Sequence, residues 1–193
     1  MRIGVTGIFA SGKGTVCSMF EQLGAGVVDT DIIAREIMEP GQEAFAAVVK
    51  EFGSSFLSAA GSLDRRAFAD YVFKDEAKVA RLNAITHPLI KKRTIERSEG
   101  GICMINVPLL FETGFDKMMD ANIVVFAERS QAISRGVLRD NISENEIKER
   151  LKHQIPLNEK KQLADYVIDN SGSRENTQRQ VAEIWNILKL SRI

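Results

Sequence analysis

The stretch Gly7-Ile8-Phe9-Ala10-Ser11-Gly12-Lys13-Gly14-Thr15 decides the fold, because it contains the G-x-x-x-x-G-K pattern of a phosphate-binding loop. A short apolar run at residues 3–6 precedes it and predicts a strand. The apolar residues that follow recur at helical spacing: Val16, Met19, Phe20 and Leu23. Glycines at Gly7 and Gly12 let the backbone curl so that successive N–H groups point at phosphate oxygens. We therefore predict a strand, a phosphate-binding loop and a helix whose positive N-terminal end faces the phosphates.

Four further apolar runs predict the remaining strands of a parallel sheet, at residues 26–29, 102–107, 122–126 and 166–168. They are continuously apolar, as expected of strands that are buried on both faces. A final helix over residues 175–190 has its apolar residues on one face: Val181, Ile184, Trp185 and Leu188. The sequence thus predicts an α/β fold with five parallel strands.

Two connections are too long for simple crossovers. We predict a single domain with a core of residues 1–29, 102–127 and 166–193, a helical insertion at about 30–101 and a helical lid at about 128–165. Within the lid, Ser143 and Glu146 have the spacing of a capping box at the start of a helix.

Composition excludes several other classes of protein. The 193 residues include 26 Lys and Arg and 26 Asp and Glu, so the formal net charge of zero gives no general attraction to nucleic acid or to an anionic membrane. Cys17 and Cys103 lack a CxxC pattern, and His87 and His153 lack metal-ligand spacing. No apolar run approaches the roughly 20 residues that span a bilayer. We expect a soluble, reduced, cytoplasmic protein that binds neither nucleic acid nor membranes.

The ligands of a magnesium ion stay open at this point. The loop motif has Ser or Thr after the lysine, but this chain has Gly14, and Thr15 is turned by about 100° along the helix. Asp29 and Asp31 follow the second strand, where they either hold a ligand or act as a turn residue and a helix cap. Thr15, Asp29 and Asp31 are the candidate metal ligands, while the uncharged Asn106 is a weak one.

Two arginines of the predicted lid, Arg135 and Arg139, are four residues apart and share a helix face. Their guanidinium groups either reach nucleotide phosphates or form an ordinary exposed face, and the residues alone do not decide between the two.

Taken together, the ordered segments resemble the dephospho-coenzyme A kinase family over nearly the whole chain. The segments that carry the resemblance are residues 7–15, Val28-Asp29-Thr30-Asp31-Ile32-Ile33-Ala34-Arg35, Glu39-Pro40-Gly41, Leu63-Asp64-Arg65-Arg66, His87-Pro88-Leu89-Ile90, Val107-Pro108-Leu109-Leu110-Phe111-Glu112 and Ala164-Asp165-Tyr166-Val167-Ile168-Asp169-Asn170.

The resemblance implies a nucleoside-monophosphate-kinase-like core, a coenzyme-A-binding insertion and a lid. The implied reaction transfers the γ-phosphoryl group of MgATP to the 3′-hydroxyl of dephospho-CoA, the last step of coenzyme A synthesis. It implies three catalytic residues: Asp31 as base, and Lys13 and Arg139 on the transferred phosphoryl. Arg35 and His87 are implied to bind dephospho-CoA together with Asp31. The implied ATP-binding residues are Ala10, Ser11, Gly12, Lys13, Gly14, Thr15, Arg139, Asn170 and Gly172.

The chain departs from the family's usual loop, G-G-I-G-S-G-K-S-T, at Ile8, Phe9, Ala10 and Gly14. Two other hypotheses therefore stay open: a small phosphate-loop kinase for a nucleoside monophosphate or a shikimate-like acceptor, and a nucleotide-binding homologue impaired by Gly14. We expect ATP and dephospho-CoA as small-molecule substrates, Mg²⁺ as cofactor, and a monomer or weak homo-oligomer.

Overall fold

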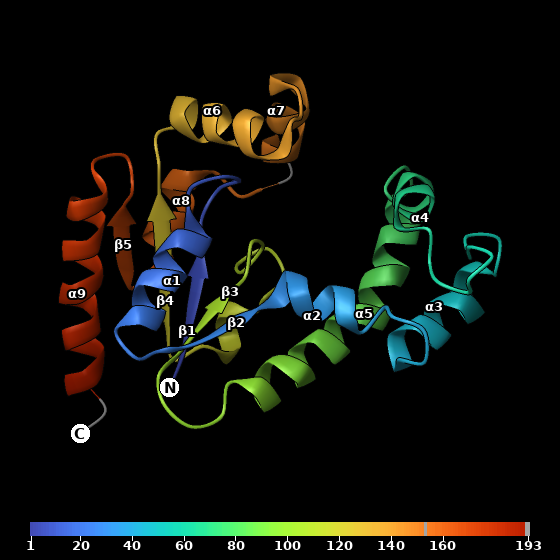
Figure 1. Cartoon of the computed structure of the whole chain (residues 1–193), viewed down its shortest axis with the longest axis horizontal. Coiled ribbons are helices and arrows are strands. Elements are labelled where there is room, and N and C mark those ends of the chain that lie inside the picture. The colour runs from blue at the N-terminus through green and yellow to red at the C-terminus, as the bar shows by residue number, and fades with distance from the viewer. Residues whose placement is uncertain (153, 192–193) are drawn as a thin grey trace. The chain divides into compact units, whose positions relative to one another are not determined.

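The computed structural model describes residues 1–152 and 154–191, so His153 lies outside the described residues. The chain divides into two compact units, one made of Met1–Asp29 and Ser98–Ile193 and the other of Thr30–Arg97. Figure 1 shows the strands and the helices α1 and α6–α9 in the first unit, and helices α2–α5 in the second.

The first unit contains a sheet of five parallel strands, which confirms the predicted fold class. The strands are β1 (Arg2–Thr6), β2 (Gly26–Asp29), β3 (Cys103–Asn106), β4 (Ala121–Phe126) and β5 (Tyr166–Asp169). Their order is β2-β3-β1-β4-β5, with β1 in the centre. In this register Asp29 lies opposite Asn106, so both residues are at the carboxyl edge of the sheet. In parallel α/β sheets this is the edge where ligands bind.

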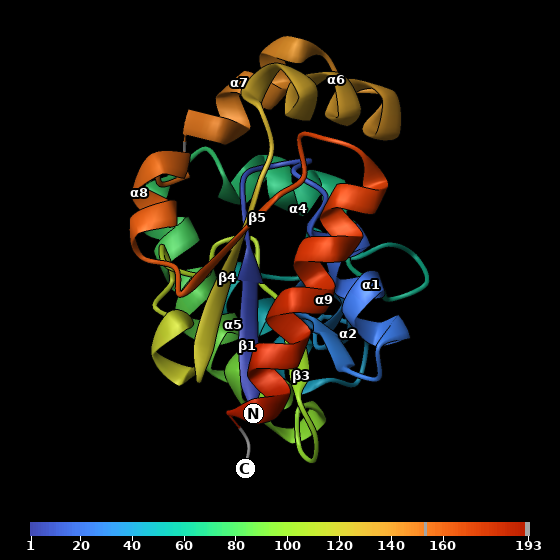
Figure 2. The same cartoon turned by 90° about the vertical axis from the view of Figure 1, so that its left-hand side faces the viewer.

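The core of the first unit lies between the sheet and two helices, α1 (Lys13–Gln22) and α9 (Arg174–Leu190), which lie side by side in Figure 2. The rings of Phe20 and Trp185 meet there at a centroid distance of 6.4 Å. Helix α1 ends at Gln22, so Leu23, the last residue of the apolar spacing, lies at its C-cap and is 42% exposed. Both cysteines are free and buried, and burial raises the pKa of the Cys17 thiol to about 12.

The segment predicted as a lid contains α6 (Arg129–Asp140), α7 (Glu144–Lys152) and α8 (Leu157–Gln162). The predicted capping box is confirmed: the Glu146 carboxylate accepts from the Ser143 N–H at 2.8 Å, and the Ser143 hydroxyl accepts from the Glu146 N–H at 3.2 Å. A short 3₁₀ turn, Asp116–Met118, precedes β4. No described helix is both long and apolar enough to cross a membrane.

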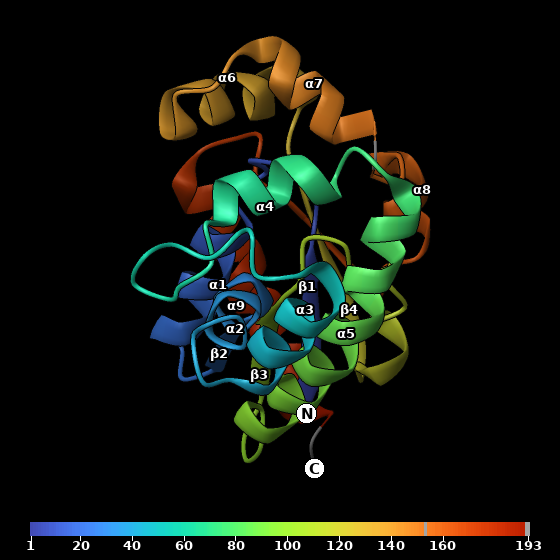
Figure 3. The same cartoon turned by 90° about the vertical axis from the view of Figure 1, so that its right-hand side faces the viewer.

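The second unit has its own small core. Its helices are α2 (Thr30–Glu36), α3 (Glu43–Phe52), α4 (Arg65–Val72) and α5 (Glu76–Arg97), and the first three pack against α5 (Figure 3). Phe68 of α4 is buried in edge-to-face contact with Phe52 and Phe56, at centroid distances of 5.3 and 5.5 Å. A single bridge between Leu57 and Leu63 is the β pairing described in this unit.

Candidate active site

The phosphate-binding loop joins β1 to α1, and at two of its glycines a larger residue would collide with neighbouring atoms. A Cβ on Gly7 would collide with the carbonyl oxygen of Val125 and lie 2.6 Å from Ser11 Oγ. Gly12 caps α1 with a φ of +95°, and a Cβ there would collide with Asn170 Nδ2. Any other residue would therefore disturb both the backbone and its neighbours at these two positions.

Lys13 is the cation of this loop. Its Nζ donates to the carbonyl oxygens of Gly7 and Ile8, at 3.2 and 3.0 Å, so the side chain folds back across the loop. The first turn of α1 contains no acidic residue. The positive end of the helix dipole is thus not neutralised locally, and the loop has the electrostatics of an anion site.

The loop conformation is held from outside the motif by Asn170, the residue that follows β5. Asn170 Nδ2 donates to the carbonyl oxygen of Ser11 at 2.8 Å, and Asn170 Oδ1 accepts from the Thr177 hydroxyl at 3.0 Å. Arg135 of α6 donates to the Asn170 carbonyl oxygen at 3.0 Å. Gly172 lies in the bend that leads from Asn170 to α9. The side chain of Asn170 thus orders the loop backbone through Ser11.

Gly14 and Thr15 are both exposed at the start of α1. A Cβ on Gly14 would meet no atom within 4 Å, and its φ is not in the left-handed region. A side chain therefore fits at position 14 without strain. The glycine deprives the loop of a hydroxyl but is not required by the fold.

The candidate magnesium ligands among the described residues are single oxygens rather than a cluster of carboxylates. No group of three or more His, Cys, Asp or Glu side chains is placed to hold a metal ion within the described ranges. At the edge of the sheet, Asp29 Oδ2 accepts from Asn106 Nδ2 at 2.7 Å, which orients this carboxylate. Asp29, Thr15 and Asp31 each offer a single oxygen, which suits Mg²⁺ because this ion usually takes several of its six oxygens from water and phosphates.

Arg139 of α6 interacts with the loop residue Phe9. Its guanidinium carbon lies 5.3 Å from the centroid of the Phe9 ring, and its Nε and Nη2 donate to the two carboxylate oxygens of Asp140, each at 2.8 Å. The hydrogen bond to Asp140 is the main cause of a raised pKa of Arg139, so the guanidinium stays charged. The structure therefore brings Arg139 against the ring of a loop residue, while Arg135 contacts the Asn170 carbonyl oxygen.

The three residues implied to bind dephospho-CoA all belong to the second unit. Asp31 and Arg35 are exposed on α2, where Asp31 lies in the first turn rather than at a cap. His87 is half-buried in α5, and desolvation, followed by the charge of Lys91, lowers its pKa. The imidazole is therefore neutral at pH 7, and each of its nitrogens can make a hydrogen bond.

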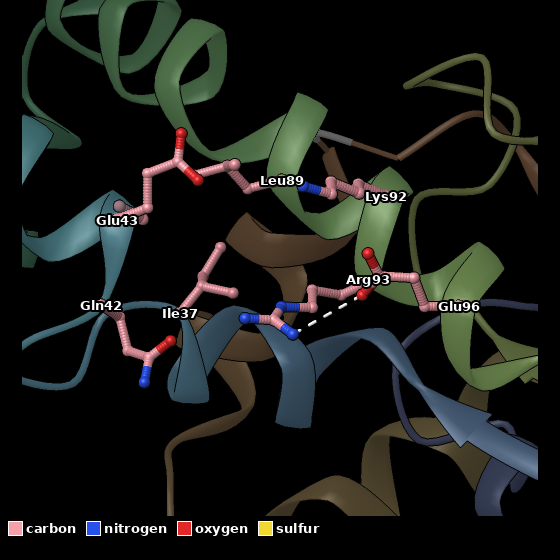
Figure 4. Close-up of a pocket in the computed structure, with 8 residues that line it drawn as sticks. Ile37, Gln42, Glu43, Leu89, Lys92, Arg93 and Glu96 are labelled. Carbon is pink, nitrogen blue, oxygen red and sulfur yellow. Dashed lines mark ion pairs between the residues drawn. The ribbon is translucent and has the colours of Figure 1, made fainter.

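Figure 4 shows a separate cavity of about 90 Å³ in the second unit. Its lining residues are Ile37, Gln42, Glu43, Ala44, Leu89, Lys92, Arg93 and Glu96. Arg93 pairs with Glu96 at 3.5 Å, and the two bases and two acids of the lining cancel formally. The cavity therefore has no net charge to attract a phosphate, and Asp31, Arg35 and His87 do not line it.

A buried ion pair that the sequence did not reveal lies beside the phosphate-binding loop. Lys160 of α8 is fully buried, and its Nζ lies 2.8 Å from Glu112 Oε1 and 3.3 Å from the carbonyl oxygen of Pro108. Glu112 Oε1 also accepts from the Ile155 N–H at 2.9 Å, and the Thr6 hydroxyl donates to the Pro108 oxygen at 3.2 Å. The pair thus ties the end of the predicted lid to the loop after β3.

The parallel sheet with its central phosphate-binding loop is the fold of the phosphate-loop kinases. A shikimate kinase from Acinetobacter baumannii shares this fold, with a TM-score of 0.57 at 14% identity over 100% of this chain and 94% of its own. The family model "Dephospho-CoA kinase" matches residues 1–176. The chain belongs to the dephospho-CoA kinase family.

Individual relatives agree with this membership. The dephospho-CoA kinase of Aquifex aeolicus is 41% identical over 191 residues, which are 97% of this chain and 97% of that protein. The crystal structure of TT1252 from Thermus thermophilus superimposes with a TM-score of 0.84, at 31% identity and with 97% of each chain covered. The likeness therefore extends over the whole chain and is not confined to the loop.

Proposed function

We propose that this protein transfers the γ-phosphoryl group of ATP to the 3′-hydroxyl of dephospho-CoA. The observation that carries the proposal is the loop itself: a side chain at Gly7 or Gly12 would collide with its neighbours, and Lys13 folds back across the loop at the start of a helix whose first turn has no acidic residue. Loop amides and a lysine in this arrangement suit a polyphosphate. Family membership over the full chain favours dephospho-CoA over a nucleoside monophosphate or a shikimate-like acceptor.

Three residues are proposed to act on the reacting groups. Asp31 orients the attacking hydroxyl and accepts its proton; a weakly basic carboxylate is sufficient because the transition state of phosphoryl transfer is loose. Lys13 and Arg139 offer fixed positive charge to the transferred phosphoryl group. Arg35 and His87 are proposed to bind dephospho-CoA, with His87 as a neutral hydrogen-bonding partner.

Magnesium is proposed to be part of the substrate, MgATP. The proposed oxygen ligands from this chain are the Asp29 carboxylate, which accepts a hydrogen bond from Asn106, the exposed Thr15 hydroxyl and the Asp31 carboxylate. Held by these residues, Mg²⁺ would neutralise negative charge on the phosphates of ATP. We further propose that the protein acts in the cytoplasm as a monomer or weak homo-oligomer.

The test is ADP release that depends on dephospho-CoA, measured for wild type, Asp31→Asn and Asp70→Asn. Asp70 is an exposed acid on α4 and serves as the matched control. We expect Asp31→Asn to lower kcat by about 100-fold or more, as is typical for loss of a general base, and Asp70→Asn to equal wild type. AMP, CMP and shikimate are assayed in parallel.

Two results would contradict the proposal. Faster turnover with any other acceptor would assign a different kinase activity. ATP binding without transfer at saturating Mg²⁺ and dephospho-CoA would instead identify a nucleotide-binding protein that has lost catalysis.

A further inference from the structure

Phe9 connects the phosphate-binding loop to α6 by its ring. Gly136 of α6 is buried, and a Cβ on it would lie 2.8 Å from Phe9 Cε1 and 2.9 Å from Ile147 Cδ1. The ring thus occupies a hollow that exists because position 136 has no side chain. The backbone of Phe9 is also held in place, because its N–H donates to Gln154 Oε1 at 3.2 Å.

The same ring lies against the arginine proposed to contact the transferred phosphoryl. Arg139 follows Gly136 by three residues, so both are on one face of α6. The guanidinium carbon is 5.3 Å from the ring centroid, within the roughly 6 Å range of a cation–π interaction. The Arg139 side chain is 62% exposed, so packing confines it little beyond the ring of Phe9 and the carboxylate of Asp140.

An aliphatic side chain of similar size could also fill the hollow at Gly136, but it has no negative π-face. The aromatic ring therefore adds an orienting interaction that depends on the charge of Arg139. A guanidinium that is already held near the loop loses less freedom when it contacts a phosphoryl group.

We propose that Phe9 is a positioning residue for phosphoryl transfer, which holds Arg139 beside the phosphate-binding loop through its ring. This inference rests on the proposed function and on the role of Arg139 within it. A cation–π contact at an exposed site corresponds to about a two- to fivefold effect on rate or affinity.

The experiment is a double-mutant cycle that measures kcat and KM for ATP with dephospho-CoA as acceptor. Phe9→Leu removes the π-face at similar size, Phe9→Tyr keeps it, and Arg139→Met removes the cation. Phe9→Leu is expected to lower kcat/KM about two- to fivefold, and Phe9→Tyr to restore most of that loss. In the Arg139→Met background, Phe9→Leu is expected to cause no further loss. Melting temperatures confirm that each variant is folded.

Equal losses from Phe9→Leu with and without Arg139 would overturn the inference, because the ring would then act on the loop alone. So would wild-type kinetics in Phe9→Leu, wild-type kinetics in Arg139→Met, or a Phe9→Tyr variant as slow as Phe9→Leu. In each of these cases the wild-type enzyme still phosphorylates dephospho-CoA and the proposed function stands. The proposed function fails separately if wild type shows no activity with dephospho-CoA. In that case the coupling between Phe9 and Arg139 is measured from the ATP affinities of wild type, Phe9→Leu, Arg139→Met and the double variant, determined by calorimetry.

Discussion

Replacing Gly14 by serine restores a hydroxyl at the position where phosphate-binding loops place a magnesium ligand. Gly14 is the second residue of α1, its φ is not left-handed, and a Cβ there would meet no atom within 4 Å. Gly14→Ser therefore fits the existing loop. Gly14→Ala is the matched control, because it adds the same Cβ without the oxygen.

The added Cβ and the added hydroxyl have separate expected effects, the first on stability and the second on magnesium binding. Glycine in a helix is about 1 kcal/mol worse than alanine, so in this first turn we expect Gly14→Ala to stabilise the protein by roughly 0.5 kcal/mol, and Gly14→Ser by slightly less. For a chain of this length that corresponds to a rise in melting temperature of about 1–2 °C. The hydroxyl is expected to lower the Mg²⁺ concentration for half-maximal rate about tenfold, equivalent to about 1.4 kcal/mol.

The assay follows ADP release at saturating ATP and dephospho-CoA while free Mg²⁺ is varied, for wild type and both variants. Only Gly14→Ser should shift the magnesium curve, whereas both variants should gain stability. If Gly14→Ala shifts the curve as far as Gly14→Ser, the effect comes from helix stiffening and the metal-ligand reasoning is refuted. An inactive wild type with an active Gly14→Ser variant would show that the natural loop has lost efficient catalysis.

Two further predictions concern buried and half-buried charge. Glu112→Gln leaves the fully buried Lys160 without its counter-charge, so the free energy of unfolding measured by urea denaturation should fall by about 3–5 kcal/mol. The double variant Glu112→Gln/Lys160→Met should recover most of this loss. A Glu112→Gln variant as stable as wild type would contradict the prediction. The pKa of His87 is lower in the folded protein than in the unfolded chain. As the pH falls below about 6.5, the unfolded chain therefore binds a proton before the folded protein does. The free energy of unfolding should fall over this pH range, until the pH is below the folded-state pKa as well. His87→Gln should flatten this part of the stability–pH curve, and an unchanged slope would show that His87 is not the source of this pH dependence.

The sequence predicts the first unit's sheet well because the decisive signals are local. Strand β1 and the start of α1 follow from the loop motif, and the other strands are short continuous apolar runs. The capping box at Ser143 is likewise local and is confirmed. Leu23 continues the apolar spacing of α1 but lies just after its last residue, because apolar spacing does not report where a helix ends.

The contacts that organise the candidate site could not be predicted in the same way, because they join distant segments. Lys160 lies in a run of polar residues that reads as a solvated surface, and its partner Glu112 is 48 positions away. Gln154 and Phe9 are 145 residues apart, and Asn170 and Ser11 are 159 apart. Neither spacing nor composition encodes such pairings, which exist only once the sheet has formed.

These distant contacts also explain how the loop tolerates a departure from the glycine-rich pattern. Ala10 has a φ of +57°, a conformation that costs a non-glycine residue roughly 1–2 kcal/mol. The hydrogen bonds from Asn170 to Ser11 and from Phe9 to Gln154 lie on either side of it and contribute about 1 kcal/mol each. Together these two hydrogen bonds stabilise the loop by about as much as the strained backbone of Ala10 destabilises it. The loop's shape is therefore set by Asn170 after β5, by Thr177 of α9 and by Gln154 of the predicted lid as well as by its own glycines.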